Sequence, residues 1–259
     1  MLFDLYVPGP GWLQRLDPRT KLFLLLVGAI LIIGAPGPVA LFVWLALLHG
    51  VLWSSGVPWS RLGWVAQQLR WLVLIILLVF PWFAASGETL VEVGPLYLTA
   101  GGLETAASTA LRLWAMSLLS TALLMTTSQR ELVRGLVALG VPWSWGFTLT
   151  VALRHIPSLL RHIQQIQEAQ AARGWDPARG GWLQRLRGVR PVLIALVIHV
   201  FRTVDTLTLA MTARGVGRGG PRTVLYPLRL GWRDGAAIIL ALALLVGVVV
   251  QRRWISDWL

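Results

Sequence analysis

The chain has 259 residues and a formal net charge of +12, and 56% of its residues are hydrophobic while only 13% are charged. Soluble domains carry roughly 25% charged residues, and disordered chains are poor in apolar and aromatic residues, so both classes are excluded. The absence of cysteine excludes a disulfide scaffold and a zinc or iron–sulfur site bound by thiolates. The composition predicts a polytopic membrane protein with a basic balance.

Five apolar runs predict membrane-spanning helices. They cover residues 21–35, 39–53, 69–85, 106–127 and 236–250. The first two flank Ala35-Pro36-Gly37-Pro38, whose density of Pro and Gly is typical of a tight turn between antiparallel helices. The fourth run contains Arg112, which must face protein or extend toward the interface.

The distribution of charge predicts the orientation of these helices. Arg15, Arg19 and Lys21 precede the first run, and two arginines lie between the second and third runs. The segment 86–104 carries three glutamates and no Lys or Arg. Because positive charge collects on the cytoplasmic side, we expect the N-terminus in the cytoplasm and segment 86–104 outside. The fifth helix would then place two arginines outside, which the same rule disfavours.

One segment carries most of the positive charge. Residues 128–234 contain fifteen arginines and five acids, a difference of +10 out of the total of +12. We therefore predict three domains: an N-terminal transmembrane domain over 1–127 with about four spans, a basic cytoplasmic domain over 128–234, and a C-terminal transmembrane helix over 235–259.

The pattern of the basic segment predicts three helices. Ser128 and Glu131 form a capping box that begins a helix ending near residue 139. Apolar residues spaced three or four apart predict a second helix over about 143–173, which Pro157 either kinks or begins. The same spacing predicts a third amphipathic helix over about 191–214, and its apolar stretch 192–201 is too short to span a membrane.

The second and third helices end in the same tripeptide. The two copies are Ala172-Arg173-Gly174 and Ala213-Arg214-Gly215, and a further copy containing Arg179 closes no helix. A cation in the last turn and a following glycine are ordinary helix-stop features. A projecting guanidinium behind an apolar ridge also suits an acidic groove on a partner. The residues alone do not decide between a helix stop and a docking site for a partner.

The sequence holds no constellation for catalysis, metal binding or a cofactor. His155 and His162 lie seven residues apart, roughly 10 Å along a helix, too far to share an ion. The single lysine, Lys21, is followed by Leu22, so a nucleotide-binding P-loop is absent. The basic residues interleave with apolar helix faces beside the spans, so nucleic-acid binding is not expected.

The ordered set of motifs resembles a known family along essentially the whole chain. Its members are the T components of energy-coupling factor (ECF) transporters and the similar cobalt-transport permeases. The motifs that carry the resemblance are Leu16-Asp17-Pro18-Arg19-Thr20-Lys21, Thr127-Ser128-Gln129-Arg130-Glu131-Leu132, Gln170-Ala171-Ala172-Arg173-Gly174 and Ala213-Arg214-Gly215.

The resemblance implies an all-α, multi-pass protein of a bacterial or archaeal cell membrane that is not an enzyme. It would be the scaffold of an ABC importer for a vitamin or a transition-metal ion. Two cytoplasmic ATPases would supply the nucleotide-binding motifs, and a small membrane protein, the S component, would bind the substrate.

The resemblance also implies roles for particular residues. Arg173 and Arg214 would each dock into one ATPase, with Ala172, Gly174, Ala213 and Gly215 shaping the helix ends. The apolar face of the third helix would contact the S component through Leu193, Leu196, Val200, Val204 and Leu207.

Two other functions are weighed against this one. The first is an ordinary ABC permease with its own substrate pathway. Glu168-Ala169 resembles the start of the coupling loop of that family, but the residues that follow, up to Gly174, do not match the loop. The second is a membrane-embedded enzyme, for which the chain lacks an acid, base or metal constellation.

Overall fold

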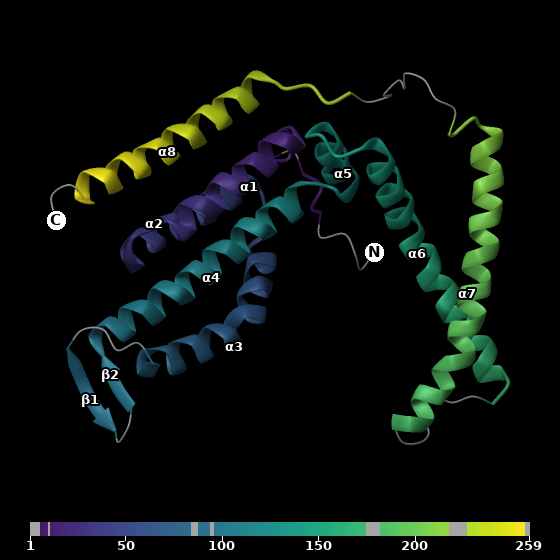
Figure 1. Ribbon diagram of the computed structural model, residues 1–259, viewed down its shortest axis with the longest axis horizontal. Coiled ribbons are helices and arrows are strands. Elements are labelled where there is room, and N and C mark those ends of the chain that lie inside the picture. Colours follow the sequence, from purple (N-terminus) through teal and green to yellow (C-terminus); the bar gives the residue numbers. More distant parts are fainter. Residues whose placement is uncertain are drawn as a thin grey trace. The chain divides into compact units, whose positions relative to one another are not determined.

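The structure, a computed structural model, describes residues 6–9, 11–83, 88–93, 96–174, 182–217 and 227–256. Helices make up most of it (Figure 1). The helices are α1 (Pro18–Ile33), α2 (Gly37–Ser54), α3 (Trp59–Phe83), α4 (Ala100–Thr126), α5 (Gln129–Ala138), α6 (Trp143–Ala172), α7 (Trp182–Ala213) and α8 (Trp232–Ser256). The predicted all-α polytopic fold is confirmed.

Packing divides the chain into two compact units. The first, which we call the bundle unit, comprises Met1–Pro142 and Leu228–Leu259, and the second, the two-helix unit, comprises Trp143–Pro227. Helix α5 belongs to the bundle unit because Gly135 lies directly on α1: a Cβ there would stand 3.0 Å from Cβ of Pro18. The division by packing therefore differs from the predicted domains, whose boundaries concern the membrane and remain predictions.

Five described helices are long and apolar enough to cross a membrane: α2, α3, α4, α7 and α8. This set differs from the predicted one. Helix α1 has 16 residues, about 24 Å, which is shorter than a hydrocarbon core of about 30 Å. Helix α7 begins at Trp182, nine residues before the predicted start, and includes Pro191 in its interior. Its stretch Val189–Ala213 has the length and composition of a span, against the prediction that it is too short.

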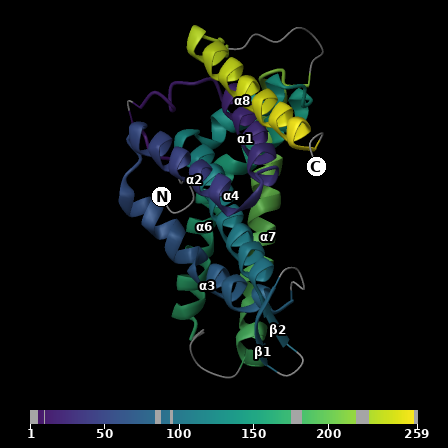
Figure 2. The ribbon, with the colours of Figure 1, turned by 90° about the vertical axis from the view of Figure 1, so that its left-hand side faces the viewer.

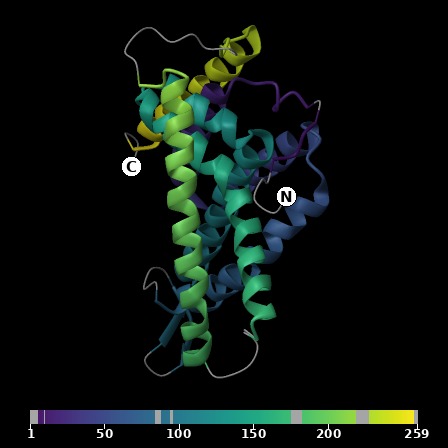
Figure 3. The ribbon, with the colours of Figure 1, turned by 90° about the vertical axis from the view of Figure 1, so that its right-hand side faces the viewer.

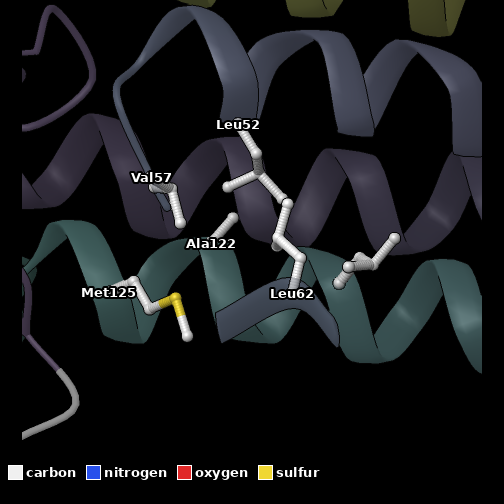
Figure 4. Close-up of a cluster of buried hydrophobic side chains, with 6 residues drawn as sticks. Leu52, Val57, Leu62, Ala122 and Met125 are labelled. Carbon is white, nitrogen blue, oxygen red and sulfur yellow. The ribbon is translucent and has the colours of Figure 1, made fainter. Parts of the chain in front are cut away.

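Helix α4 forms the centre of the bundle unit and packs against α1, α2 and α3. Its buried positions are mainly small: Ala106, Ala110, Ala115 and Ala122. Small side chains let helix backbones approach closely, which matters in a bilayer because lipid tails are as apolar as leucine and give helices little hydrophobic drive to associate. Larger side chains fill the remaining space, as Figure 4 shows for Leu52, Leu62 and Met125 between α2, α3 and α4.

A short antiparallel hairpin joins α3 to α4. Strands β1 (Thr89–Val93) and β2 (Leu96–Thr99) pair Thr89 with Thr99 and Val93 with Leu96. No strand was predicted here, although two runs rich in β-forming residues around a Gly-Pro pair are a usual hairpin signal. The hydroxyl of Thr99 then caps α4 by accepting from N–H of Gly102 at 3.0 Å.

At the hairpin end of the bundle unit, Arg112 faces protein, as predicted. Its Nε donates to O of Ile32 and its guanidinium also donates to O of Ala35, both at 3.4 Å. These carbonyls lie at the end of α1, so the partly buried cation satisfies acceptors that the helix itself leaves open.

At the opposite end, the start of α1, the end of α4 and the start of α8 meet in buried polar contacts. We call Asp17, Lys21, Thr126 and Asp234 the polar end cluster. The Lys21 ammonium donates to O of Thr126 at 2.8 Å and to O of Gln14 at 3.1 Å. Lys21 therefore caps the carboxyl end of α4 with a positive charge, which suits the helix dipole.

Asp17 and Asp234 connect α1 to α8. The carboxylate of Asp17 caps α1 by accepting from N–H of Arg19, at 2.9 Å. The carboxylate of Asp234 accepts from N–H of Asp17 and from N–H of Gly231, each at 2.8 Å. One side chain thus satisfies backbone donors at the starts of both helices. No local sequence pattern indicates that Asp234 serves the starts of two helices.

We expect Asp234→Ala to destabilise the protein by about 2 kcal/mol, because it leaves two backbone N–H groups at the end of the bundle without their acceptor. In detergent the variant should unfold about 5 °C below the parent chain. Asp205→Ala, which removes an exposed carboxylate from α7, is the matched control. Equal melting temperatures for the two variants would contradict the bracing role of Asp234.

Candidate coupling surface

The two-helix unit consists of α6 and α7, which have 30 and 32 residues and are among the longest described helices. They run antiparallel and lean against each other (Figures 1 and 3). Pro157 lies inside α6 and Pro191 inside α7, and both helices continue through them. At 1.5 Å per residue each helix is roughly 45 Å long, so small rotations about their contact move their ends over large distances.

The contact includes a pair of stacked histidines. The ring centroids of His162 on α6 and His199 on α7 lie 3.8 Å apart, with 26° between the ring planes. His162 Nδ1 lies 2.7 Å from O of Ser158, and the hydroxyl of Thr203 lies 3.4 Å from His199 Nε2. No pattern in the sequence indicates this contact: His162 was compared only with His155, and 37 residues separate it from His199.

Both Ala-Arg-Gly tripeptides end their helices as predicted. Gly174 has φ +88° and Gly215 has φ +75°, left-handed conformations that favour glycine. At the end of α7, N–H of Val216 donates to O of Met211 at 3.0 Å, which closes the last turn. Each glycine turns the chain away immediately after the arginine, so the arginine stands at the end of the helix.

The two arginine side chains are exposed. Neither makes a hydrogen bond or ion pair through its guanidinium to another residue in the described ranges. Arg173 lies eleven residues beyond His162, and Arg214 lies fifteen residues beyond His199. Because the helices are antiparallel, the arginines lie on opposite sides of the histidine contact, roughly 16 and 22 Å from it. The further copy with Arg179 falls outside the described residues.

The apolar residues predicted to contact an S component differ in exposure. Leu193 and Val204 are about half exposed, while Leu196, Val200 and Leu207 are partly covered. The three partly covered residues follow the side of α7 that carries His199. The sequence analysis did not single out the more exposed ridge on the other side, where Phe201 is 66% exposed. This ridge comprises Ile194, Val197, Ile198 and Phe201.

Within the described ranges, no group of three or more His, Asp or Glu residues is placed to hold a metal ion. The two-helix unit therefore offers exposed cations, an apolar ridge and a stacked contact. These features suit binding to other proteins and movement of one helix against the other.

Comparison with known proteins identifies the family. The sequence profile of the CbiQ family, described as "Cobalt transport protein", matches residues 10–223. The chain belongs to the CbiQ/EcfT family. This membership confirms the resemblance drawn from the order of the sequence motifs.

Relatives match over nearly the full chain, and each is named energy-coupling factor transporter transmembrane protein EcfT. The relative from Listeria innocua is 31% identical over 261 residues, 98% of both chains. That from Thermosediminibacter oceani is 34% identical and covers 95% of this chain and 96% of its own. That from Brevibacillus brevis is 31% identical and covers 93% and 94%. These names describe transmembrane transporter components and not ATPases.

The absence of native cysteine allows a direct test of the contact between α6 and α7. We expect His162→Cys with His199→Cys to be joined by a short bifunctional thiol reagent, because their rings stack in the parent chain. Arg173→Cys with Arg214→Cys should stay unlinked by the same reagent, because these positions lie on opposite sides of the contact. Equal linking of both pairs, measured by mass spectrometry of peptides, would contradict the arrangement.

Proposed function

We propose that the chain is the non-catalytic coupling subunit, the T component, of an ECF-type ABC importer for a vitamin or a transition-metal ion. It would pass movement from cytoplasmic ATPases to a membrane-embedded S component that binds the substrate. The observation that carries the proposal is the pair of exposed arginines at opposite ends of two helices that stack on each other. Membership of the family and the names of the relatives support it.

The geometry favours two ATPase subunits over one. Each arginine presents a rigid, always-charged fork at a helix end, which matches carboxylates in an acidic groove. Measured along the helices, Arg173 lies roughly 16 Å and Arg214 roughly 22 Å from the histidine contact, in opposite directions. The two helix ends can therefore each reach a different docking surface. Ala172, Gly174, Ala213 and Gly215 leave the space around each guanidinium open, because they are the smallest side chains.

The apolar surface of α7 is the proposed contact for the S component. Leu193 and Val204 are exposed members of the predicted set, and Leu196, Val200 and Leu207 would transmit movement from the face shared with His199. The exposed ridge centred on Phe201 extends this surface. A contiguous exposed apolar surface marks an interaction site, and a membrane partner would cover it.

The proposed orientation follows from charge and from the fold of the bundle unit. One end of the bundle unit holds the start of α1, the ends of α2 and α4, and the start of α8. Trp12 donates to the hydroxyl of Ser54 at the end of α2, Lys21 donates to O of Thr126 at the end of α4, and N–H of Asp17 donates to Asp234 at the start of α8. Arg15, which precedes α1, and Arg19, in the first turn of α1, favour a cytoplasmic position for this end by the positive-inside rule. The N-terminus and the coupling domain would be cytoplasmic, in the cell membrane of a bacterium or archaeon.

We expect Arg173→Glu combined with Arg214→Glu to abolish copurification of the ATPases, because each change places like charges against an acidic groove. Apparent affinity should fall roughly 100-fold or more. Membrane insertion should be unchanged, since both residues lie at exposed helix ends. The measurement is the ratio of ATPase to this chain after affinity purification in mild detergent.

A matched control reverses two other exposed arginines of α6, Arg154→Glu with Arg161→Glu, which give the same change in net charge away from the helix ends. This variant should keep the ATPases. Undiminished copurification in the double variant of Arg173 and Arg214 would overturn the docking assignment. Binding of the transported substrate by the purified chain without an S component would favour an ordinary permease instead.

A further inference from the structure

An apolar groove of about 530 Å³ lies within the bundle unit, between α8 and the helices α1, α2 and α4. Its walls are chiefly leucine, alanine and valine side chains, among them Leu24, Leu48, Leu123 and Leu240. Helix α8 packs on α1 through Ala241 against Val27 and Leu31, and all three residues line the groove. Figure 2 shows α8 lying along α1.

Charge is confined to one end of the groove. The charged residues that line it are Lys21 and Arg233, and no carboxylate is among the described lining residues. Three carboxylates act on Lys21 from outside the lining, those of Asp17, Asp234 and Glu131, and each accepts from a backbone N–H group. The groove therefore presents positive charge at its mouth and an apolar interior.

The two cations are still able to bind an anion. The Lys21 ammonium has three N–H groups, of which two donate to O of Gln14 and O of Thr126. No described residue accepts from the third. The guanidinium carbon of Arg233 lies 5.7 Å from the centroid of the Trp232 ring, and the arginine side chain is exposed.

Two tryptophans stand at the same mouth. Trp12 and Trp232 both line the groove, and Trp232 is 80% exposed. Tryptophan collects at the boundary between headgroups and acyl chains, with arginine and lysine beside it. The mouth therefore has the residue types of a membrane interface.

The length of the groove matches one leaflet of a bilayer. Along α1 it extends from Lys21 to Leu31, and along α8 from Arg233 to Leu244. These stretches are roughly 15 and 16 Å long at 1.5 Å per residue, and half of a hydrocarbon core is about 15 Å. A groove that begins at charged residues and ends near the bilayer midplane fits one acyl chain.

We infer that this groove binds one anionic phospholipid from the leaflet at the polar end cluster. The phosphate binds the Lys21 ammonium and the Arg233 guanidinium, and an acyl chain lies between α8 and the helices α1, α2 and α4. Basic pockets between membrane helices on the cytoplasmic side commonly bind acidic lipid headgroups. The bound lipid fills the space that separates α8 from α2 and α4. This inference rests on the membrane fold and not on the proposed coupling role.

The test uses the full chain in vesicles that contain equal parts of phosphatidylglycerol and phosphatidylcholine with identical acyl chains. After gentle detergent extraction, native mass spectrometry should show one phosphatidylglycerol retained per parent chain. Arg233→Gln should reduce this retention roughly tenfold, because it removes one charge-assisted contact. Ala237→Phe, which fills the groove from α8, should abolish it.

Two controls match these changes outside the groove. Arg134→Gln removes an exposed arginine from α5, and Ala243→Phe adds the same ring to an exposed position of α8 that does not line the groove. Both should retain phosphatidylglycerol as the parent chain does. The melting temperature of each variant shows whether it is folded.

Three results would overturn the inference. One is equal retention of phosphatidylcholine and phosphatidylglycerol, which would show that the cations do not favour the anionic headgroup. The second is unchanged retention in folded Arg233→Gln or Ala237→Phe, which would place the lipid elsewhere. The third is loss of the lipid from the parent chain in the assembled transporter, which would show that a partner helix covers the groove.

Discussion

The bundle unit depends on how its helices satisfy their backbone groups at one end. Lys21 donates to the carbonyls that end α4 and precede α1, and Asp234 accepts from the N–H groups that start α1 and α8. Burying such charges costs several kcal/mol unless each is fully paired and hydrogen-bonded. Here the backbone supplies most of the pairing, so the charges hold the ends of three helices in one arrangement.

This constraint has consequences for the rest of the chain. Helix α5 follows directly after the end of α4, begins with the Ser128–Glu131 capping box, and packs on α1 through Gly135. Arg112 lies inside a candidate span and donates to carbonyls at the end of α1, whereas Arg173 and Arg214 are exposed at the ends of their helices.

Several local features could be predicted from the sequence because each depends on neighbouring residues. The capping box, the glycine stops after Arg173 and Arg214, and the apolar runs of α2, α4 and α8 are of this kind. The predicted start of α7 was wrong because Pro191 was taken for a proline in the first turn of a helix, whereas it lies in the interior of α7. The stack of His162 on His199 and the bonds of Asp234 join residues far apart in sequence, so no local pattern could indicate them. The docking roles of the arginines remain predictions.

The proposed coupling role requires α6 and α7 to move against each other when the partner ATPases bind ATP. Two exposed positions near the helix ends, Glu168 on α6 and Leu209 on α7, can be changed to cysteine and spin-labelled in the otherwise cysteine-free chain. Pulsed electron spin resonance on the assembled transporter then measures the distance between the labels. The account predicts a shift of about 5 Å, the scale of a one-turn helix displacement, between the nucleotide-free and ATP-bound states. An identical distance distribution in both states, in a complex that still hydrolyses ATP and transports substrate, would contradict it.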